Sequence, residues 1–184
     1  MRLTFISHGM TAALRAARFP DDEPLEERAL EAAHAAAARI RAPVRALCDG
    51  TARTTQTAHA LGLTPTVDPS ALADLDVGHW RGLTLDQVPP DELYAWTIDT
   101  TATPHGGESI DTLLTRVAEW MSHTTSVSGR TTVITHPAVI RAALVTTLHT
   151  AHTTFWRIDI PPLTATSLYR RSGRWTLQHT NATM

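Results

Sequence analysis

The sequence predicts an α/β protein, a three-layer α/β/α sandwich around a mostly parallel mixed sheet. Three observations predict this fold. Short apolar segments alternate with longer amphipathic ones, no repeat or low-complexity linker interrupts them, and 184 residues suffice for one domain with a sizeable core. We therefore expect residues 1–184 to form a single domain that binds ligands where strands end and helices begin.

The first half of the chain contains two predicted strands, each followed by a helix. Arg2–Ser7 is largely apolar, as a buried strand should be. Leu25–Arg41 is predicted to be helical, because apolar residues recur at helical spacing. These residues are Leu30, Ala33, Ala37 and Ile40. Val44–Asp49 is predicted to be a second short strand, and Thr51–Leu61 a second helix with a hydroxyl residue near its N-cap.

The second half continues the alternation and ends in a hairpin. Ser109 is the predicted N-cap of a third helix, whose apolar face consists of Leu113, Leu114, Val117, Trp120 and Met121. Thr131–Thr135 is predicted to be a core strand. Pro137–His149 is predicted to be helical because proline suits the first position of a helix. Two strand-like segments flank Ser172-Gly173 and predict the hairpin, Thr166–Arg170 and Arg174–His179.

The composition excludes several classes of protein. A net charge of -2 argues against a general nucleic-acid binder or a polybasic membrane-surface protein. The single cysteine, Cys48, excludes an internal disulfide framework, and the absence of lysine excludes Schiff-base chemistry and a P-loop. No apolar segment approaches the ~20 residues that span a bilayer, and the N-terminus lacks a signal pattern. We therefore expect a cytoplasmic protein.

Residues suited to binding an anion follow three of the predicted strands. His8-Gly9 follows the first strand, Arg53 lies in the first turn of the helix after the second, and His136 precedes Pro137 after the third. The carboxyl ends of parallel strands meet at one edge of a sheet, where the free N–H groups of helix N-termini favour anions. These residues predict a pocket for a phosphate or carboxylate.

Six segments, in this order and at these spacings, resemble the motifs of one known family. They are FISHGMT, DDEPLEERALEAA, TARTTQTAHALGL, ALADLDVGHWRGLT, PHGGES and VITHPAVIRAALV. The first resembles an Arg-His-Gly-Glu-Thr segment. The third matches an Arg-x-x-Gln-Thr-Ala helix through Arg53, Gln56, Thr57 and Ala58. On these motifs the chain resembles, over nearly its whole length, the histidine phosphatase superfamily, which includes phosphoglycerate mutases and broad-specificity phosphomonoesterases.

The resemblance implies a role for each matching residue. His8 matches the nucleophile, whose imidazole nitrogen attacks phosphorus to give a phosphohistidine that water later hydrolyses. His136 matches a second histidine that stabilises the transferring phosphoryl group, and Arg53 matches an arginine that clamps two phosphate oxygens. Asp74 falls where the family has a glutamic acid that protonates the leaving oxygen. Gly9 belongs to the nucleophile loop and is expected to contact the substrate.

Several residues near these motifs are further candidates. Asp76 and His79 are alternatives to Asp74 as the acid, although Asp76 also suits a turn or cap. His79 stands where related phosphatases often carry another Glu, and Glu108 lies in the segment that resembles Gly-Gly-Glu-Ser. The resemblance therefore implies that His79 and Glu108 bind the substrate. Three tryptophans are candidates for lining a substrate mouth, Trp80, Trp96 and Trp156.

Ser7 occupies the position of the family's first arginine, which neutralises the phosphate beside the nucleophile. We expect Ser7 to contact the substrate through a neutral hydrogen bond, which is about half as strong as a charge-assisted one. Arg15 and Arg18 are candidates for supplying the missing charge. The resemblance thus implies that the site keeps two histidines but neutralises phosphate less strongly.

The resulting hypothesis is a phosphomonoester hydrolase that acts on a small phosphorylated metabolite without a cofactor or metal. Two alternatives stay open. One is a dehydration, cyclisation or isomerisation of a neutral or carboxylate substrate with His8 and His136 as acid and base, which the uncharged Ser7 favours. The other is a catalytically silent binding protein. The expected partner is a small molecule rather than nucleic acid or membrane, and a homodimer also stays open.

Overall fold

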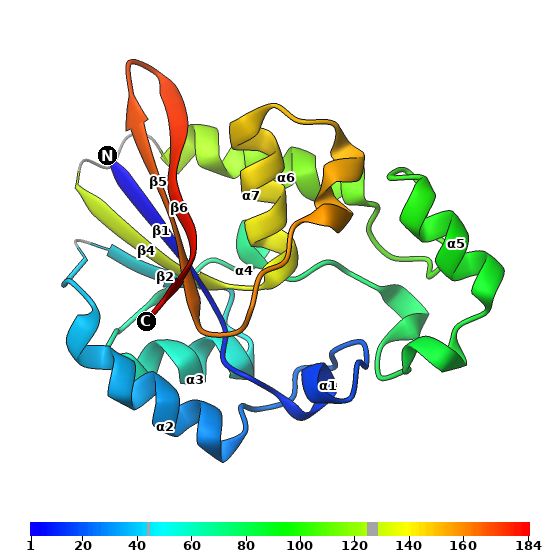
Figure 1. Cartoon of the computed structure of the whole chain (residues 1–184), viewed down its shortest axis with the longest axis horizontal. Helices are drawn as coiled ribbons and strands as arrows, with labels where there is room; N and C mark the ends of the chain where they lie inside the picture. Colours follow the sequence, from blue (N-terminus) through cyan, green and yellow to red (C-terminus); the bar gives the residue numbers. More distant parts are fainter. Residues whose placement is uncertain (44, 125–128) are drawn as a thin grey trace.

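The computed structural model describes residues 1–43, 45–124 and 129–184, and their strands form a six-stranded sheet. The strands lie in the order β3-β2-β4-β1-β5-β6 (Figure 1). Their bounds are β1 (Arg2–Ser7), β2 (Arg45–Cys48), β3 (Thr66–Val67), β4 (Arg130–Thr135), β5 (Thr164–Arg171) and β6 (Arg174–Thr183). The pairs β3–β2, β2–β4 and β4–β1 are parallel, whereas β1–β5 and β5–β6 are antiparallel. This mixed, mostly parallel sheet confirms the predicted α/β fold.

Helices cover both faces of the sheet. The α-helices are α1 (Ala12–Arg15), α2 (Glu27–Ala36), α3 (Ala52–Ala60), α4 (Pro69–Leu72), α5 (Pro90–Ile98), α6 (Ile110–His123) and α7 (Pro137–Leu148). Short 3-10 helices are η1 (Ala37–Arg39), η2 (Gly78–Trp80), η3 (Leu85–Gln87) and η5 (His152–Arg157). α2 and α3 pack on one face, and α6 and α7 pack on the other (Figure 1).

Successive strand residues point into two different apolar clusters. Phe5 and Val133 belong to the cluster under α6 and α7, and their chain neighbours Ile6 and Ile134 belong to the cluster under α2 and α3. All four side chains are almost fully buried. Because side chains alternate along a strand, a sheet covered on both faces requires adjacent apolar residues, which Phe5-Ile6 in β1 and Val133-Ile134 in β4 supply.

The predicted starts of two helices are confirmed by their caps. The Ser109 hydroxyl accepts a hydrogen bond from the Thr112 N–H at 3.1 Å and caps α6. His136 is the N-cap of α7, and Pro137 is the first helical residue. α7 ends at Leu148, one residue earlier than predicted, because His149 adopts a left-handed conformation with a φ of 51°. Local cap chemistry therefore set these boundaries.

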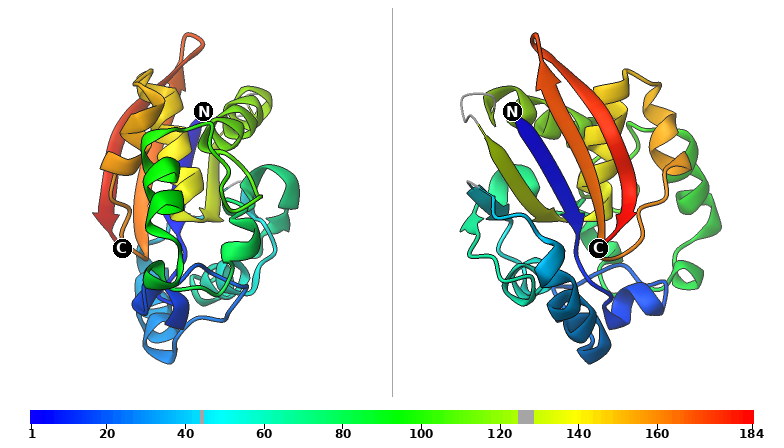
Figure 2. Two further views of the ribbon diagram at one scale, coloured as in Figure 1. Left: turned by 90° about the vertical axis from the view of Figure 1, so that its right-hand side faces the viewer. Right: turned by 60° about the vertical axis from the view of Figure 1, so that its left-hand side comes forward.

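Other boundaries differ from the predictions. The helix expected over Leu25–Arg41 is shorter, because α2 starts after the N-cap Glu26 and tightens into η1. The strand expected over Val44–Asp49 is β2, and Val44 lies outside the described residues. The elements β3, α4 and α5 were not predicted. The terminal hairpin is longer than expected, and its tip projects past the neighbouring strands (Figure 2).

The parallel strands bring their carboxyl ends to one edge of the sheet. Ser7 pairs with Thr135 at the ends of β1 and β4, so the next residues, His8 and His136, lie side by side. The His8 N–H extends this pairing with a hydrogen bond of 3.0 Å to the Thr135 carbonyl. Among the described helices, none combines the length and apolar character that a membrane span needs.

Candidate active site

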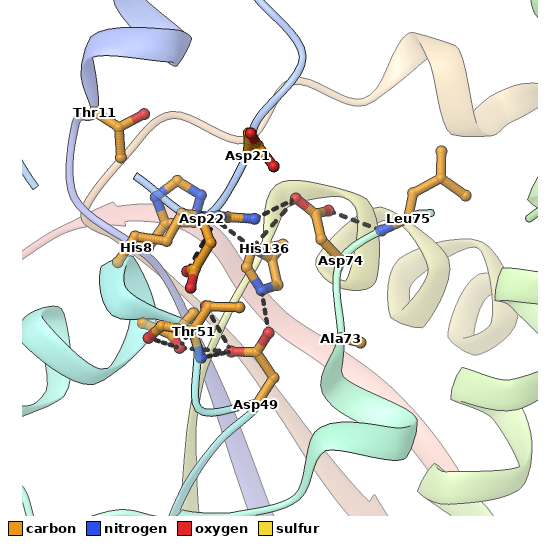
Figure 3. A network of polar contacts seen from close by, with 12 residues as sticks. His8, Thr11, Asp21, Asp22, Asp49, Thr51, Ala73, Asp74, Leu75 and His136 are labelled. Carbon is orange, nitrogen blue, oxygen red and sulfur yellow. Dashed lines mark hydrogen bonds and ion pairs between the residues drawn. The ribbon is translucent and has the colours of Figure 1, made fainter. Parts of the chain in front are cut away.

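Two buried histidines face each other at the strand ends, as Figure 3 shows. The ring centroids of His8 and His136 are 5.4 Å apart, in an edge-to-face arrangement. His8 is 6 % exposed and His136 is fully buried. Parallel pairing of β1 with β4 alone brings the two rings together, although the residues are far apart in sequence.

The hydrogen bond of His8 to its own loop leaves one ring nitrogen free. His8 Nδ1 lies 2.8 Å from the Gly9 carbonyl oxygen, and because a carbonyl only accepts, Nδ1 carries the proton. Nε2 therefore keeps its lone pair. Burial, and after it the proximity of His136, lowers the pKa of His8 to about 4. At neutral pH the ring is uncharged, as a nucleophilic imidazole must be.

His136 is held by a carboxylate on its other side. His136 Nε2 lies 2.9 Å from Asp49 Oδ2, and both side chains are buried. Burial alone would raise the pKa of Asp49, but the hydrogen bond from His136 and those from two threonine hydroxyls outweigh it and lower that pKa. The ionised Asp49 accepts a hydrogen bond from the Nε2–H of His136 and so fixes the orientation of the ring. Nδ1 of His136 faces Arg53, whose Nε lies 3.3 Å away.

Arg53 joins the second histidine to the candidate acid. Its side chain comes from the first turn of α3 and is 4 % exposed. Arg53 NH2 donates to Asp74 Oδ2 at 3.1 Å. Arg53 NH1 lies 4.0 Å from Asp22 Oδ1 and has no hydrogen-bond partner among the described residues. A buried guanidinium with a free donor is suited to binding an anion oxygen.

Asp74 lies against both Arg53 and His136. Its Oδ2 is 3.3 Å from His136 Nδ1, and its Oδ1 accepts a hydrogen bond of 2.9 Å from the Leu75 N–H. Burial raises the pKa of Asp74, but His136 and Arg53 together outweigh burial and lower it. In this state Asp74 is therefore ionised at neutral pH.

Two cavities meet at Asp74. The main cavity has a volume of about 180 Å³ and includes His8, Asp74, Arg141 and an aromatic wall defined as Phe19, Trp96, Phe155 and Trp156. The acidic cavity has a volume of about 260 Å³, and its polar lining includes Asp21, Asp22, Asp49, Arg53 and Asp76. The reactive nitrogen of His8 therefore belongs to a largely apolar cavity, and Arg53 borders the acidic one.

The comparisons with known proteins agree with this geometry. Residues 3–183 match the model of the histidine phosphatase superfamily (branch 1). The chain belongs to this family. No curated protein sequence matches the chain significantly.

Several solved structures that are similar to this chain are phosphatases. A mycobacterial glucosyl-3-phosphoglycerate phosphatase in complex with vanadate is 27% identical, with a TM-score of 0.88 over 99% of each chain. Its complex with inorganic phosphate has a TM-score of 0.84, at 25% identity, over 99% of this chain and 97% of the other. A phosphoserine phosphatase from Entamoeba histolytica, in complex with 3-phosphoglyceric acid, shares the fold at 18% identity and a TM-score of 0.89, over 100% and 98% of the chains.

Ser7 of this histidine phosphatase does not belong to the described lining of either cavity. It is fully buried, and its hydroxyl donates to the Pro161 carbonyl at 2.6 Å and accepts from the Thr164 N–H at 3.0 Å. Of the two arginines considered as replacements for the family's first arginine, Arg15 is paired with Glu26 at the surface. Arg18 borders the main cavity.

Glu108 and His79 lie apart from the two histidines. Glu108 receives hydrogen bonds from Arg116 Nε and NH2 at 2.6 and 2.9 Å. Arg116 also donates to the Ala73 and Asp74 carbonyls at 2.8 and 3.1 Å, so this ion pair holds the segment that carries Asp74. His79 is exposed in η2 and is absent from the described lining of both cavities.

Gly9 contributes a backbone hydrogen bond and a close approach to its neighbours, and Asp76 forms an ion pair at the surface. The Gly9 N–H donates to the Thr57 hydroxyl at 3.0 Å, and a Cβ on Gly9 would approach the Ala29 Cβ to 3.2 Å. A side chain at position 9 would therefore require small shifts of Ala29 or Leu25. Asp76 is half exposed and paired with Arg81 at 2.7 Å.

The sequence analysis missed two residues of the site, Asp49 and Arg141. Asp49 directly follows β2, so the same strand-end argument that selected His8 and His136 would have selected it. Arg141 lies one helical turn after Pro137 in α7, at the spacing that returns to the same helix face. Among the described residues, no cluster of three or more His, Cys, Asp or Glu is arranged to hold a metal ion.

Proposed function

We propose that the protein is a phosphomonoester hydrolase that acts on a small phosphorylated metabolite through a phosphohistidine at His8. One observation carries the proposal: a neutral imidazole with a free Nε2 lies beside His136 and Arg53 at a cavity. The mycobacterial neighbours, which are phosphatases with bound vanadate or phosphate, support the same chemistry.

Phosphate binding is assigned to Arg53 and His136. Arg53 NH1 is buried without a hydrogen-bond partner in the described part of the chain, so a phosphate oxygen would satisfy it. The Nε2–H of His136 donates a hydrogen bond to Asp49, and Nδ1 faces Arg53 and Asp74. When protonated at Nδ1, His136 donates to a phosphate oxygen and stabilises the charge of the transition state.

In the first chemical step, the lone pair of His8 Nε2 attacks phosphorus and the bond to the leaving oxygen breaks. Asp74 protonates that oxygen in this scheme. The free site holds Asp74 ionised through Arg53 and His136. A bound phosphate brings negative charge beside the carboxylate and draws Arg53 away, and both changes raise the pKa of Asp74. In the second step, Asp74 takes a proton from a water whose oxygen attacks phosphorus, the bond between phosphorus and His8 Nε2 breaks, and inorganic phosphate leaves.

The remaining sequence candidates receive supporting roles. We assign Glu108 to positioning, because its partner Arg116 binds the carbonyl of Asp74. Ser7 anchors the segment before β5 rather than the substrate, because its hydroxyl is occupied by Pro161 and Thr164. Within the described residues, His79 lines neither cavity, so it receives no role in substrate binding.

A second candidate function is a non-phosphoryl reaction with His8 and His136 as base and acid. Two observations favour it: Ser7 replaces the family's first arginine, and Arg53 is already paired with Asp74. A neutral or carboxylate substrate would need less positive charge than a phosphate dianion. The experiment below separates the two functions.

The decisive test is to trap the covalent intermediate. Protein mixed with p-nitrophenyl phosphate and quenched within milliseconds should gain one phosphate that is labile in acid and stable in base, located on His8 by peptide mass spectrometry. His8→Ala should gain none. His59→Ala, which removes an exposed histidine of α3, is the matched control and should be labelled normally. No label on the wild-type protein, together with no hydrolysis of a phosphomonoester panel, contradicts the proposal and leaves the non-phosphoryl reaction or silent binding.

A further inference from the structure

The main cavity beyond His8 has an aromatic wall. The ring centroids of Trp96 and Trp156 are 4.4 Å apart, and those of Phe155 and Trp156 are 5.0 Å apart. Phe19 completes the wall at 5.8 Å from Trp96. The cavity volume of about 180 Å³ is close to the ~150 Å³ of a cavity that holds one benzene ring. Its size and surface therefore suit a single flat apolar group.

The side-chain acceptors among the residues described for this cavity are few, and Glu23, Thr11 and Asp74 each already accept hydrogen bonds from the protein. Glu23 accepts from the Thr11 hydroxyl at 2.9 Å and from the Asp21 N–H at 2.8 Å. The Thr11 hydroxyl in turn accepts from the Leu14 N–H at 3.2 Å. Asp74 accepts from Arg53 and from a backbone N–H. A sugar presents many hydroxyl protons that need acceptors, so this lining does not suit a polyhydroxylated substrate.

Arg141 is a cation of the cavity wall that is held in place but unpaired within the described residues, whereas Arg18, which also borders the cavity, is exposed. Its Nε donates to the Ile158 carbonyl at 2.7 Å, and its guanidinium carbon lies 5.6 Å from the centroid of the Phe155 ring. These contacts hold the stem and the plane of the guanidinium. No hydrogen bond or ion pair within the described ranges occupies its two terminal nitrogens. Such a fork is shaped for two carboxylate oxygens.

We propose that the organic part of the substrate is a flat apolar group that carries a carboxylate, with the carboxylate on Arg141 and the apolar body against the aromatic wall. Arg141 then determines specificity and does not take part in the chemical step. Arg53, at the other side of Asp74, binds the phosphate. The substrate class rests on the proposed phosphatase function, whereas the carboxylate subsite does not require turnover.

A matched pair of substrates tests Arg141. 4-Carboxyphenyl phosphate and 4-carbamoylphenyl phosphate have nearly the same shape and differ in the charge of the distal group. In the wild type, kcat/KM should favour the carboxylate about tenfold, as expected for a charge-assisted bidentate contact. Arg141→Gln should bring the ratio close to one. Comparing ratios between variants cancels the different reactivity of the two leaving groups.

Two further variants separate charge from folding. Arg141→Lys keeps the charge without the fork and should retain part of the preference for the carboxylate. Arg157→Gln removes an exposed arginine of η5 and should leave the ratio unchanged. If Arg141→Gln lowers kcat/KM equally for both substrates, Arg141 contributes to phosphate binding or to folding rather than to carboxylate binding, and the inference is wrong. If Arg141→Gln does not fold, Arg141→Lys decides: a ratio equal to that of the wild type means that the fork does not contact the carboxylate, and the inference is wrong.

A binding measurement keeps this inference independent of turnover. 4-Hydroxybenzoate and 4-hydroxybenzamide are titrated against the wild type and Arg141→Gln, with quenching of the wall tryptophans as the signal. The wild type should bind the acid about tenfold more tightly than the amide, and Arg141→Gln should bind the two alike. If no phosphomonoester is hydrolysed but this preference appears, the proposed function fails and the subsite stands. If the wild type shows no preference, the subsite is refuted whatever the activity.

Discussion

His8 and His136 occupy equivalent places in the fold and have opposite environments. Each follows a parallel strand of the sheet and is buried. His8 bonds only to the carbonyl of its own loop and keeps Nε2 free, whereas His136 is held between Asp49 and Arg53. The strand end supplies the position, and the neighbouring groups decide which ring nitrogens are engaged, a difference that assigns attack to His8 and stabilisation to His136 in the proposed function.

The comparison also explains why only one of the two histidines borders the main cavity. A carboxylate partner fixes the orientation of an imidazole, while a carbonyl partner fixes its proton without adding a charge. Asp49 therefore makes His136 suited to an electrostatic role.

The largest effect is expected for turnover in the histidine variants. His8→Ala should abolish hydrolysis of both alkyl phosphates and p-nitrophenyl phosphate, because no nucleophile remains. His136→Ala should lower kcat by about two to three decades, as loss of a transition-state donor does, and should still accept phosphate on His8. Steady-state kinetics and quench labelling measure both. The two assignments would be reversed if His8→Ala still gained the phosphate label and His136→Ala did not.

Asp74→Asn should separate good leaving groups from poor ones. Hydrolysis of an alkyl phosphate should fall by about two to four decades, because the alkoxide needs a proton. Hydrolysis of p-nitrophenyl phosphate should fall much less, because its phenolate leaves unaided. The comparison of kcat/KM values on the two substrates is the measurement. Asp76→Asn, which alters a half-exposed neighbour, is the control. An equal loss on both substrates would assign Asp74 a positioning role.

His136→Ala should lose more stability than His8→Ala, although His8→Ala should lose more activity. His136→Ala leaves Asp49 buried without its partner, which typically costs about 3–5 kcal/mol. His8→Ala breaks only a bond to a carbonyl and removes a desolvated ring, so it should cost about 1 kcal/mol or less. Urea unfolding monitored by circular dichroism measures both. Equal losses would mean that Asp49 does not hold His136 as a charged partner.

The low pKa of His8 predicts the pH dependence of stability. Below pH 6.5 the unfolded chain protonates this histidine, and the folded protein does so only near pH 4. The unfolded state therefore binds more protons between these values, and stability falls as the pH is lowered through this window. The loss attributable to His8 is about 3 kcal/mol.

The difference in unfolding free energy between wild type and His8→Ala isolates this contribution. It should change by about 3 kcal/mol between pH 6.5 and pH 4. A difference that does not vary with pH would show that His8 titrates normally. The acid limb of kcat/KM should likewise lie near pH 4 rather than near 6.5, because the free enzyme must carry a neutral His8.

The smallest effect concerns Ser7, the neighbour of the nucleophile. Ser7→Ala leaves a buried carbonyl and N–H with fewer partners, which should cost about 1–2 kcal/mol. Inhibition by phosphate should change less than about twofold, because the hydroxyl faces Pro161 and Thr164. Denaturation and inhibition constants are compared with those of Ser70→Ala, an exposed hydroxyl variant. A marked loss of phosphate affinity would show that Ser7 contacts the substrate.

Local signals in the sequence predicted much of the fold. Ser109 and Pro137 marked the starts of α6 and α7 because caps and first-turn prolines act within one turn of chain. The strand-end rule placed His8, Arg53 and His136 at one edge of the sheet, since parallel strands align their carboxyl ends. The two-residue β3 escaped prediction because no alternation can be recognised over so short a strand.

Sequence reasoning placed His8, Arg53 and His136 together at the strand ends, but only the folded chain shows which groups contact each of them. The contact of His136 with Asp49 joins residues 87 positions apart, and the bond of Ser7 to Pro161 spans 154. Burial and partner charges set the pKa of His8, and both depend on packing across the sheet rather than on neighbours in the chain. Helical spacing from Pro137 could have suggested Arg141, but only the packing of α7 against Phe155 and Ile158 shows that its Nε is engaged while no hydrogen bond within the described residues occupies its terminal nitrogens.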